Sequence, residues 1–347
     1  MPVYRRVRKD ILFYKFCCES MSSSSLHINN HSSLGMMMNV YRTASRFCFL
    51  IIFAAPVFGL SQEAETSPGI RHEILIAGGF TGILDEQGNE VWKTKGGAKD
   101  ATRFENGHIL ITYKDEVVEF DRAKEIVWQY KKDPADAELV SAWRLAGGQT
   151  LITVLGNQPR LIEVNPDGKV SKTIPVDPEQ TDNHHMQTRM ARKLPNGNYL
   201  APHLLGFSVK EYTPSGEVVA DLKTDTEHFG GPQTKHWPFT AIRLENGNTL
   251  VGCTYGNRVV EFDAKGQVVW ELENDDVDGI IKDACGIQRL PNGNTVVTSY
   301  GQRDKDAVKI FEVTPDKKVV WTYNGHHAHH FQVLTTNGKP IAGPPLK

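Results

Sequence analysis

Apolar and polar residues alternate in short runs along most of the chain after residue 65. Clear examples are residues 249–253 and 258–262, which read Thr-Leu-Val-Gly-Cys and Arg-Val-Val-Glu-Phe. A period of two residues is typical of β-strands, and the Asn-Gly and Asp-x-x-Gly sequences between the runs are typical of hairpin turns. No helical pattern of comparable strength occurs in this region. The chain is therefore predicted to be all-β.

Two phrases recur along the sequence, R-x-x-N-G-x-x-L-V and then V-x-E-F-D-x-x-G-x-V-V-W. Corresponding turn residues are separated by 41, 49, 50, 46 and 45 residues. These residues are Asn106, Gly147, Asn196, Asn246, Asn292 and Asn337. A period of about 40 to 50 residues fits a four-stranded propeller blade. Each copy is thus expected to form one blade.

The two ends of the repeat region complete each other. The first copy begins at Glu73 without an opening strand or an Asn-Gly turn, whereas the last residues supply both, at 331–334 and 337–338. We expect this C-terminal strand, at about 330–336, to pair with the N-terminal blade, because closure hides sheet edges that an open array would expose. One composite and five whole copies predict a single six-bladed β-propeller.

Several copies carry an acidic or hydroxyl residue seven positions before a tryptophan, at the outer turn. The pairs are Asp85 and Trp92, Asp121 and Trp128, Asp263 and Trp270, and Thr314 and Trp321. The first residue suits a tight turn, and the indole is expected to bury against the neighbouring blade.

These steps resemble the tryptophan-docking repeat of quinoprotein-like (PQQ-repeat) propellers over about residues 72–338. The blade count and the sequence Leu-Pro-Asn-Gly-Asn-Thr at 290–295 are also similar to arylsulfotransferase-like propellers. The resemblance implies a propeller. Quinone-dependent members usually have eight blades and a vicinal cysteine pair at the active site, but here that pair, Cys17 and Cys18, lies in the leader, so PQQ binding is not supported. The sulfotransferases use a histidine near the axis, and no residue here matches it by motif.

The N-terminal region is interpreted as a leader, residues 1–61, with an apolar core at 47–60. Fourteen apolar residues are too few to span a bilayer comfortably but suit a signal peptide. Cleavage near Ser61 would export a protein with a linker at 62–71, a propeller at 72–340 and a tail at 341–347, to the periplasm or the extracellular space and without stable membrane insertion. The alternative is a membrane anchor at 47–60. Translation starts either at Met1 or at one of Met36 to Met38.

The net charge and the cysteine content limit the kinds of partner and of covalent cross-link that the protein is expected to have. The whole chain has a net charge of −2, and because the leader holds seven basic and two acidic residues, the remainder carries about −7. An acidic surface argues against nucleic-acid binding, and a monomer is expected. Cys253 and Cys285 remain after the leader, either as a disulfide, which export permits, or as two buried thiols.

The connections from the outermost strand of one blade to the innermost strand of the next hold eight of the 13 histidines. They are His184, His185, His228, His236, His326, His327, His329 and His330. These connections lie on the face opposite the Asn-Gly turns and converge near the axis. Four readings stay open: solvated loop residues, packing residues, a divalent-metal site using His184, His236, His329 and His330, or catalysis without metal by His185, His236 or His330. The cofactor is unknown.

A second pattern repeats on the same face. Tyr255-Gly-Asn-Arg258 and Tyr300-Gly-Gln-Arg303 lie one blade apart, between the second and third strands. Arginines there could hold a carboxylate, phosphate or sulfate, and the alternative is a glycine-permitted turn with solvated arginines. The favoured function is an exported binding or scaffold propeller with a small anionic ligand or a protein partner on this face. The alternative is a transferase- or lyase-like enzyme of the channel mouth, similar to the arylsulfotransferase-like group, that uses histidine with or without a metal on an anionic substrate.

The sequence predicts which face binds ligand. Replacing Asn246-Gly247 should lower the melting temperature with little change in affinity, because these residues serve only a favoured turn. Replacing His236 and His330 with alanine should abolish binding at little cost in stability. Melting temperature and ligand affinity measured on both variants test the assignment, which fails if the turn variant alone loses binding.

Overall fold

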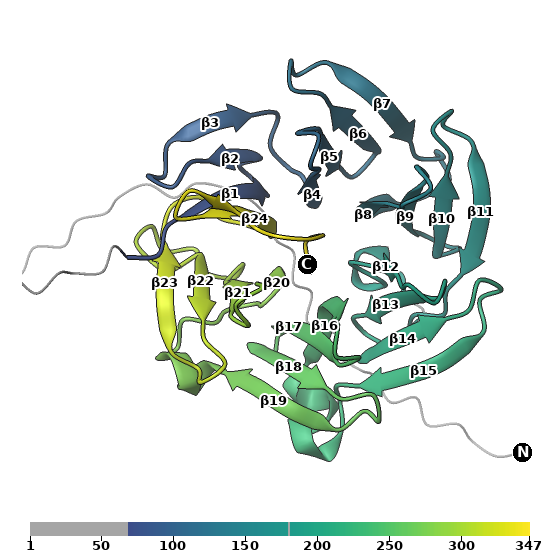
Figure 1. Cartoon of the computed structure of the whole chain (residues 1–347). Helices are drawn as coiled ribbons and strands as arrows, with labels where there is room; N and C mark the ends of the chain where they lie inside the picture. The colour runs from purple at the N-terminus through teal and green to yellow at the C-terminus, as the bar shows by residue number, and fades with distance from the viewer. Residues whose placement is uncertain (1–68, 180) are drawn as a thin grey trace, which may run out of the picture. The chain divides into compact units, whose positions relative to one another are not determined.

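The computed structural model describes residues 69–179 and 181–347. They form six small antiparallel sheets arranged in a ring (Figure 1). The predicted six-bladed β-propeller is thereby confirmed. The expected signal peptide, its cleavage point, the alternative start codons and most of the linker lie outside the described residues. Within the described part of the chain, no helix is long and apolar enough to cross a membrane.

The blades follow one another in chain order. Blade 1 contains β24 (His330–Thr336), β1 (His72–Ala77), β2 (Gly82–Leu84), β3 (Glu90–Lys93) and the short β25 (Lys339–Pro340). Blade 2 contains β4 (Asp100–Arg103), β5 (Ile109–Thr112), β6 (Glu116–Phe120) and β7 (Ile126–Lys131), and blade 3 contains β8 (Glu138–Arg144), β9 (Thr150–Leu155), β10 (Arg160–Val164) and β11 (Val170–Pro175). Blade 4 contains β12 (Arg192–Lys193), β13 (Tyr199–His203), β14 (Ser208–Tyr212) and β15 (Val218–Lys223). Blade 5 contains β16 (His236–Arg243), β17 (Thr249–Tyr255), β18 (Arg258–Phe262) and β19 (Val268–Glu273), and blade 6 contains β20 (Ile287–Arg289), β21 (Thr295–Thr298), β22 (Ile310–Val313) and β23 (Val319–Tyr323). In the described residues, four 3₁₀ helices lie in connections between blades: η1 (His184–Met186), η2 (Glu227–Phe229), η3 (Pro232–Thr234) and η4 (Asn274–Val277).

Blade 1 closes the ring as predicted. Its innermost long strand, β24, pairs antiparallel with β1 from Ala77 opposite His330 to His72 opposite Thr336. A bulge between Glu73 and Ile74 shifts the register by one residue. The short β25 continues the chain as a hairpin beside β24, an element that the sequence pattern did not predict.

The apolar core is divided among the interfaces between neighbouring blades. Between blades 1 and 2, for example, Leu75 and Ile83 of one sheet pack against Ile111 and Val118 of the next. Equivalent clusters join the other neighbouring blades around the ring. Because side chains alternate along each strand, every sheet buries both of its faces, one against each neighbouring blade.

A charged pair accompanies most of these interfaces. In four repeats, the basic residue that opens the repeat contacts the glutamate at the V-x-E-F-D position of the preceding blade. Lys193 lies 2.6 Å from Glu163, and Arg243 and Arg289 lie 2.9 Å from Glu211 and Glu261. The basic residue and the glutamate that recur in the repeat therefore form an ion pair between neighbouring blades.

The closing interface uses a different pair, because β24 has no arginine at this position. His72 of β1 instead places Nε2 2.7 Å from Oε2 of Glu312 in blade 6, and both side chains are buried. Burial alone would raise the pKa of Glu312, but hydrogen bonds from His72 and Asn294 hold it below its usual value.

The tryptophans behave as predicted. Trp92 packs against Phe120 of the next blade, and Nε1 of Trp270 donates to the carbonyl of Pro315 in blade 6 at 2.8 Å. Trp321 meets His72 across the closing interface. Asp85, Asp121 and Asp263 accept backbone N–H groups two and four residues ahead, which is the expected turn chemistry.

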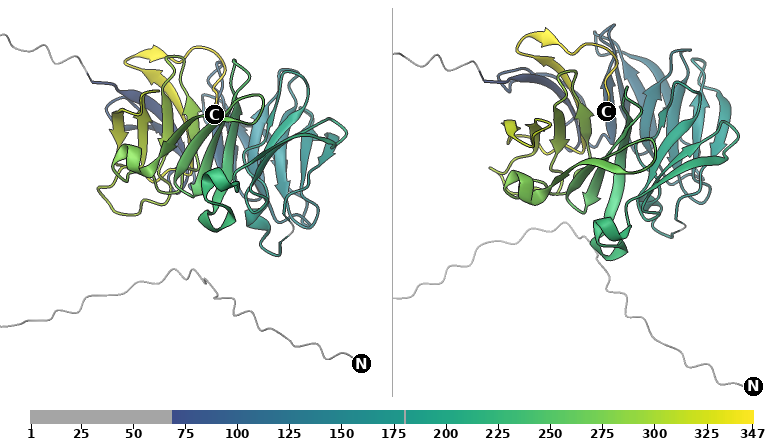
Figure 2. Two further views of the ribbon diagram at one scale, coloured as in Figure 1. Left: turned by 90° about the horizontal axis from the view of Figure 1, so that it is seen from below. Right: turned by 60° about the horizontal axis from the view of Figure 1, so that its bottom comes forward.

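The ring has two distinct faces. We call the side of the Asn-Gly hairpins, such as Asn246-Gly247, the turn face, and the side of the blade-to-blade connections, such as 224–235, the loop face. Figure 2 shows η2 and η3 projecting on one side and the yellow hairpin of β24 and β25 on the other. At the turn face Gly247 has φ of +86°, as the hairpin requires.

The closing strand should carry a large share of the stability. Phe331 of β24 is fully buried in the core between blades 6 and 1, so Phe331→Ala should lower the free energy of unfolding by about 3–5 kcal/mol. Val319→Ala, at an exposed position of β23, should change it by less than about 0.5 kcal/mol. Guanidinium denaturation compares the two variants. Equal effects would show that β24 lies outside the cooperative core.

Candidate functional site at the loop-face mouth

Residues that precede or begin the innermost strands come together at the loop-face end of the channel. We call them the mouth cluster: Lys99, Glu138, His185, Arg189, Tyr300 and His329. They come from four blade junctions, before β4, at β8, before β12 and before β24, and from the connection between β21 and β22 within blade 6. The ring therefore assembles this group from residues far apart in the sequence.

A histidine and a glutamate form the outer part of the mouth cluster. Nδ1 of His185 donates to Oε1 of Glu138 at 2.6 Å. The Glu138 side chain is buried, whereas 47% of the His185 side chain is exposed. Burial alone would raise the pKa of Glu138, but the hydrogen bond and charge of His185, with Arg189 and Lys99 nearby, lower it to about 2. An ionised carboxylate thus orients an imidazole ring that is about half exposed.

Two cations lie beside this pair. Lys99 places Nζ 3.9 Å from Oε2 of Glu138. The buried guanidinium of Arg189 donates to the carbonyls of Thr188 and His185 and lies over the ring of Phe239. Burial lowers the pKa of Arg189 to about 10, which leaves it charged at neutral pH. With Glu138 as the nearby anion, the mouth cluster has an excess positive charge.

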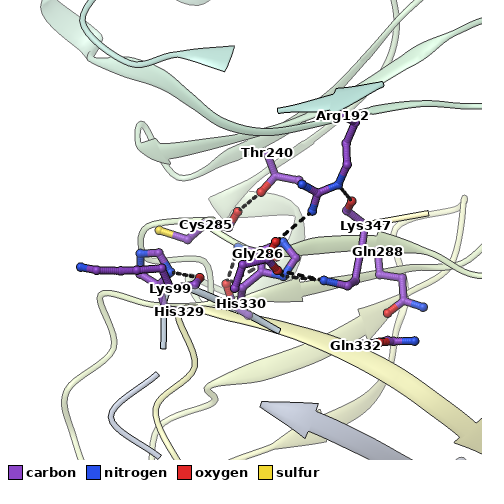
Figure 3. Close-up of polar contacts among 12 residues, drawn as sticks. Lys99, Arg192, Thr240, Cys285, Gly286, Gln288, His329, His330, Gln332 and Lys347 are labelled. Atoms are coloured by element: carbon purple, nitrogen blue, oxygen red, sulfur yellow. Dashed lines mark hydrogen bonds and ion pairs between the residues drawn. The ribbon is translucent and has the colours of Figure 1, made fainter. Parts of the chain in front are cut away.

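His329 connects the cluster to its apolar floor. Its Nδ1 donates to the carbonyl of Lys99 at 2.9 Å, and its ring meets Tyr300 and Phe239 edge-on (Figure 3 shows the contact with Lys99). Burial lowers the pKa of His329 to about 3, so the ring is neutral. Met190, Leu204, Phe239 and Cys285 form the floor.

Deeper in the channel is a second group, the axial cluster: Asp100, Arg192, His330 and Lys347. Lys347 places Nζ 3.0 Å from Oδ1 of Asp100, and Nη2 of Arg192 lies 3.4 Å from Oδ2. Figure 1 shows the segment that ends at Lys347 reaching the centre of the ring, and Figure 3 shows the contact between Arg192 and Lys347. Residues 341–347 were expected to form only a tail, and no feature of the repeat pattern indicated that they enter the channel.

A cavity of about 1280 Å³ opens on the turn face. Trp143, Arg103 and Arg144 line it from blades 2 and 3, and Ile341 and Pro344 line it from the segment beside β25. The turn face, which the sequence predicted to be functionally quiet, therefore also offers a place for a ligand.

The structure separates the three histidines proposed for catalysis. His185 lies in the mouth cluster and His330 in the axial cluster. His236 begins β16 elsewhere, where Nδ1 contacts Oγ1 of Thr234 at 2.7 Å and the ring covers Gly256. His236 and His330 are 5% and 0% exposed. The expectation that replacing both would cost little stability is therefore corrected, because each is packed or hydrogen-bonded inside the protein.

The two Tyr-Gly-x-Arg copies have different surroundings. Arg258 contacts Glu271 and Glu273 of the neighbouring strand, at 2.8 and 2.5 Å. Tyr255 is exposed and lies against Trp237. Arg303, by contrast, lies over the ring of Tyr300, and Tyr300 contacts His329 of the mouth cluster. Only the second copy adjoins the mouth.

The metal candidates are likewise spread out. His184 lies in η1, His329 in the mouth cluster and His330 in the axial cluster, while His236 is in blade 5. In residues 69–179 and 181–347, no group of three or more His, Cys, Asp or Glu side chains is arranged to hold a metal ion. Cys253 and Cys285 are free and buried, and burial raises the pKa of each thiol to about 12.

Sequence reasoning missed Lys99, Asp100, Glu138, Arg189 and Arg192. All lie at or just before the start of an innermost strand, whose other residues are largely apolar. A charged residue at a buried strand position needs a partner, and this rule could have identified Asp100 and Arg192 as members of a buried cluster. It could not have shown which blades supply the partners.

No protein-family model matches the sequence, and no curated protein does. Among solved structures, a protein of unknown function from Bacteroides caccae is similar, with 21% identity, a TM-score of 0.66 and coverage of 79% of this chain and 100% of that one. Virginiamycin B lyase from Staphylococcus aureus is also similar. A catalytically inactive histidine-to-alanine variant of it with quinupristin has 13% identity, a TM-score of 0.52 and coverage of 74% and 85%, and a selenomethionine form has 12% identity and a TM-score of 0.50, with 74% and 84%. At these identities the similarity shows the propeller fold alone.

The buried histidines predict an acid-sensitive fold. Burial lowers the pKa of His203 and His329 to about 3 and of His236 to about 4. Near pH 6 the unfolded chain binds protons that the folded chain excludes, so the free energy of unfolding falls as pH decreases from about 6.5 toward 4. His329→Gln should make this dependence shallower by about 1 kcal/mol per pH unit. Denaturation curves at several pH values test this, with His228→Gln, at an exposed side chain, as the control. Parallel curves for the wild type and His329→Gln would contradict it.

Proposed function

We propose that the protein is an exported binding propeller whose mouth cluster holds a small anionic ligand. The observation that carries this proposal is the charge arrangement of the mouth. Arg189 is buried against carbonyl groups, Lys99 and His185 lie at the opening, and Glu138 is the carboxylate beside them. Cations partly removed from water attract an anion more strongly than solvated ones do.

The remaining loop-face residues extend this site. Arg303 and Tyr300 adjoin the mouth, and Arg303 is exposed, so it could contact the outer part of the ligand. Arg258 and Tyr255, which the sequence also suggested, are less suitable because Arg258 is already paired with Glu271 and Glu273. Export rests on the apolar run at 47–60, and the quinoprotein-like or arylsulfotransferase-like resemblance supports only the architecture.

A test begins with the purified protein and a panel of sulfate, phosphate and benzoate, with melting temperature as the measurement. At least one anion should raise the melting temperature saturably. Lys99→Met should weaken its affinity roughly 10- to 100-fold, as expected for loss of a charge-assisted hydrogen bond. Lys169→Met, which removes an exposed lysine at an outer turn, is the matched control. Equal affinity in the two variants, or no saturable response to any anion, would overturn the proposal.

A second candidate is a lyase-like enzyme, and the pair of His185 and Glu138 favours it. A carboxylate that orients an accessible imidazole is a common general-base arrangement. A propeller of similar architecture, virginiamycin B lyase, is described as catalytically inactive when one histidine is replaced by alanine. Chromatographic loss of quinupristin on incubation with the protein tests this activity directly. Turnover that disappears in His185→Gln but persists in His228→Gln would support it, and no turnover would count against this substrate class.

A further inference from the structure

The surroundings of Lys347 are those of a cation site. Its Nζ lies 3.0 Å from Oδ1 of Asp100, 3.5 Å from Nδ1 of His330 and 5.9 Å from the centre of the Trp143 ring. A carboxylate, a neutral imidazole nitrogen and the face of an indole together recognise an ammonium group. Lys347 is 1% exposed, so this site is enclosed.

We propose that the axial cluster is a binding site for a primary ammonium group, and that the side chain of Lys347 fills it from within the same chain. The backbone of the same segment is held beside it, because Nε of Arg192 donates to the carbonyl of Lys347 and N of Arg289 donates to the carbonyl of Leu346, both at 3.0 Å. The segment 341–347 thus lies in the channel as a tethered ligand would.

The charges around the Lys347 side chain allow another ammonium group to replace it. Asp100 faces two cations, Arg192 and Lys347. When Lys347 leaves, Asp100 and Arg192 remain as a one-to-one pair, so the fold does not need the ammonium for neutrality. Burial lowers the pKa of Lys347 to about 8, so most of this group remains charged at neutral pH.

Among the described residues, buried hydrogen-bonding groups without a partner occur on the axial cluster and on strands of blades 2 and 6. In the described part of the chain, Nε2 of His330, Nε2 of Gln288 and Oγ1 of Thr102 are buried without a partner. Such groups cost free energy unless a ligand or water satisfies them. These groups could form hydrogen bonds with polar atoms of a ligand, in addition to the contacts that Lys347 makes.

The turn-face cavity provides the entrance. Thr102 and Trp143 line it from the propeller, and Ile341, Gly343 and Pro344 of the segment form another wall. Between β25 and Leu346, the segment is attached by one backbone hydrogen bond, from Ile341 to Leu334 at 3.0 Å. If this segment lifts, a free amine reaches Asp100 through the cavity.

The test uses n-butylammonium as the probe, because it matches the lysine side chain in length. In Lys347→Ala it should raise the melting temperature saturably, by about 3 °C at ten times the dissociation constant. The double variant Lys347→Ala, Asp100→Asn should not respond, and n-butanol should have no saturable effect on either. No response in Lys347→Ala, or an equal response in the double variant or with butanol, overturns the proposal.

A second measurement uses the unaltered chain, in case Lys347→Ala does not fold. The amide of Arg289 is protected by its bond to Leu346, so displacement of the segment by saturating n-butylammonium should speed hydrogen exchange there about tenfold relative to n-butanol. Unchanged exchange would overturn the proposal. Neither measurement involves an anion or the mouth cluster, so this inference and the proposed function can fail independently.

Discussion

The pairing of β24 with β1 is the contact on which the rest of the ring depends. Each blade buries its two faces against two different neighbours, so an open row of six would leave two apolar faces in water. β24 supplies the innermost strand of blade 1 from the far end of the sequence and thereby gives blades 6 and 1 a complete common core. Because β1 and β24 are over 250 residues apart in the sequence, we expect this strand pair to form only after the intervening blades have brought the two strands close together.

Closure also explains where the repeat departs from its own rule. Elsewhere an arginine or lysine at the end of an innermost strand contacts a glutamate of the preceding blade. At the interface between blades 6 and 1, the innermost strand β24 has no arginine or lysine. His72 of the adjacent strand β1, which has a shorter side chain, makes a fully buried contact with Glu312 instead. This interface thus also has a contact between a basic side chain and a glutamate of the preceding blade, but the basic residue is a histidine on a different strand. A buried imidazole serves here because its two nitrogens can contact both Glu312 and Thr336.

The sequence was sufficient for the architecture because local chemistry repeats. Asn246-Gly247 and the step from Asp263 to Trp270 specify a turn and an outer strand wherever they occur, and their spacing counts the blades. The site was less predictable. His185 was found because histidines gather in the blade-to-blade connections, and Tyr300 because the Tyr-Gly-x-Arg sequence occurs twice, but Glu138 and Arg189 look like ordinary strand and loop residues. They form a site because connections from five blades converge on one axis, and no single repeat of the sequence shows which connections meet there.

The same geometry links the two clusters of the channel. Lys99 and Asp100 are consecutive, as are His329 and His330, and in each pair the first residue belongs to the mouth cluster and the second to the axial cluster. Successive side chains at the start of a strand point to different sides, so one strand serves both groups. The carbonyl of Lys99 is fixed by His329 while Asp100 is fixed by Lys347. A backbone shift at Asp100 or His330 is therefore expected to reach the neighbouring residue of the mouth cluster. The chain segments that begin β4 and β24 thus each supply one residue to the mouth cluster and one to the axial cluster, which links the two groups through the backbone.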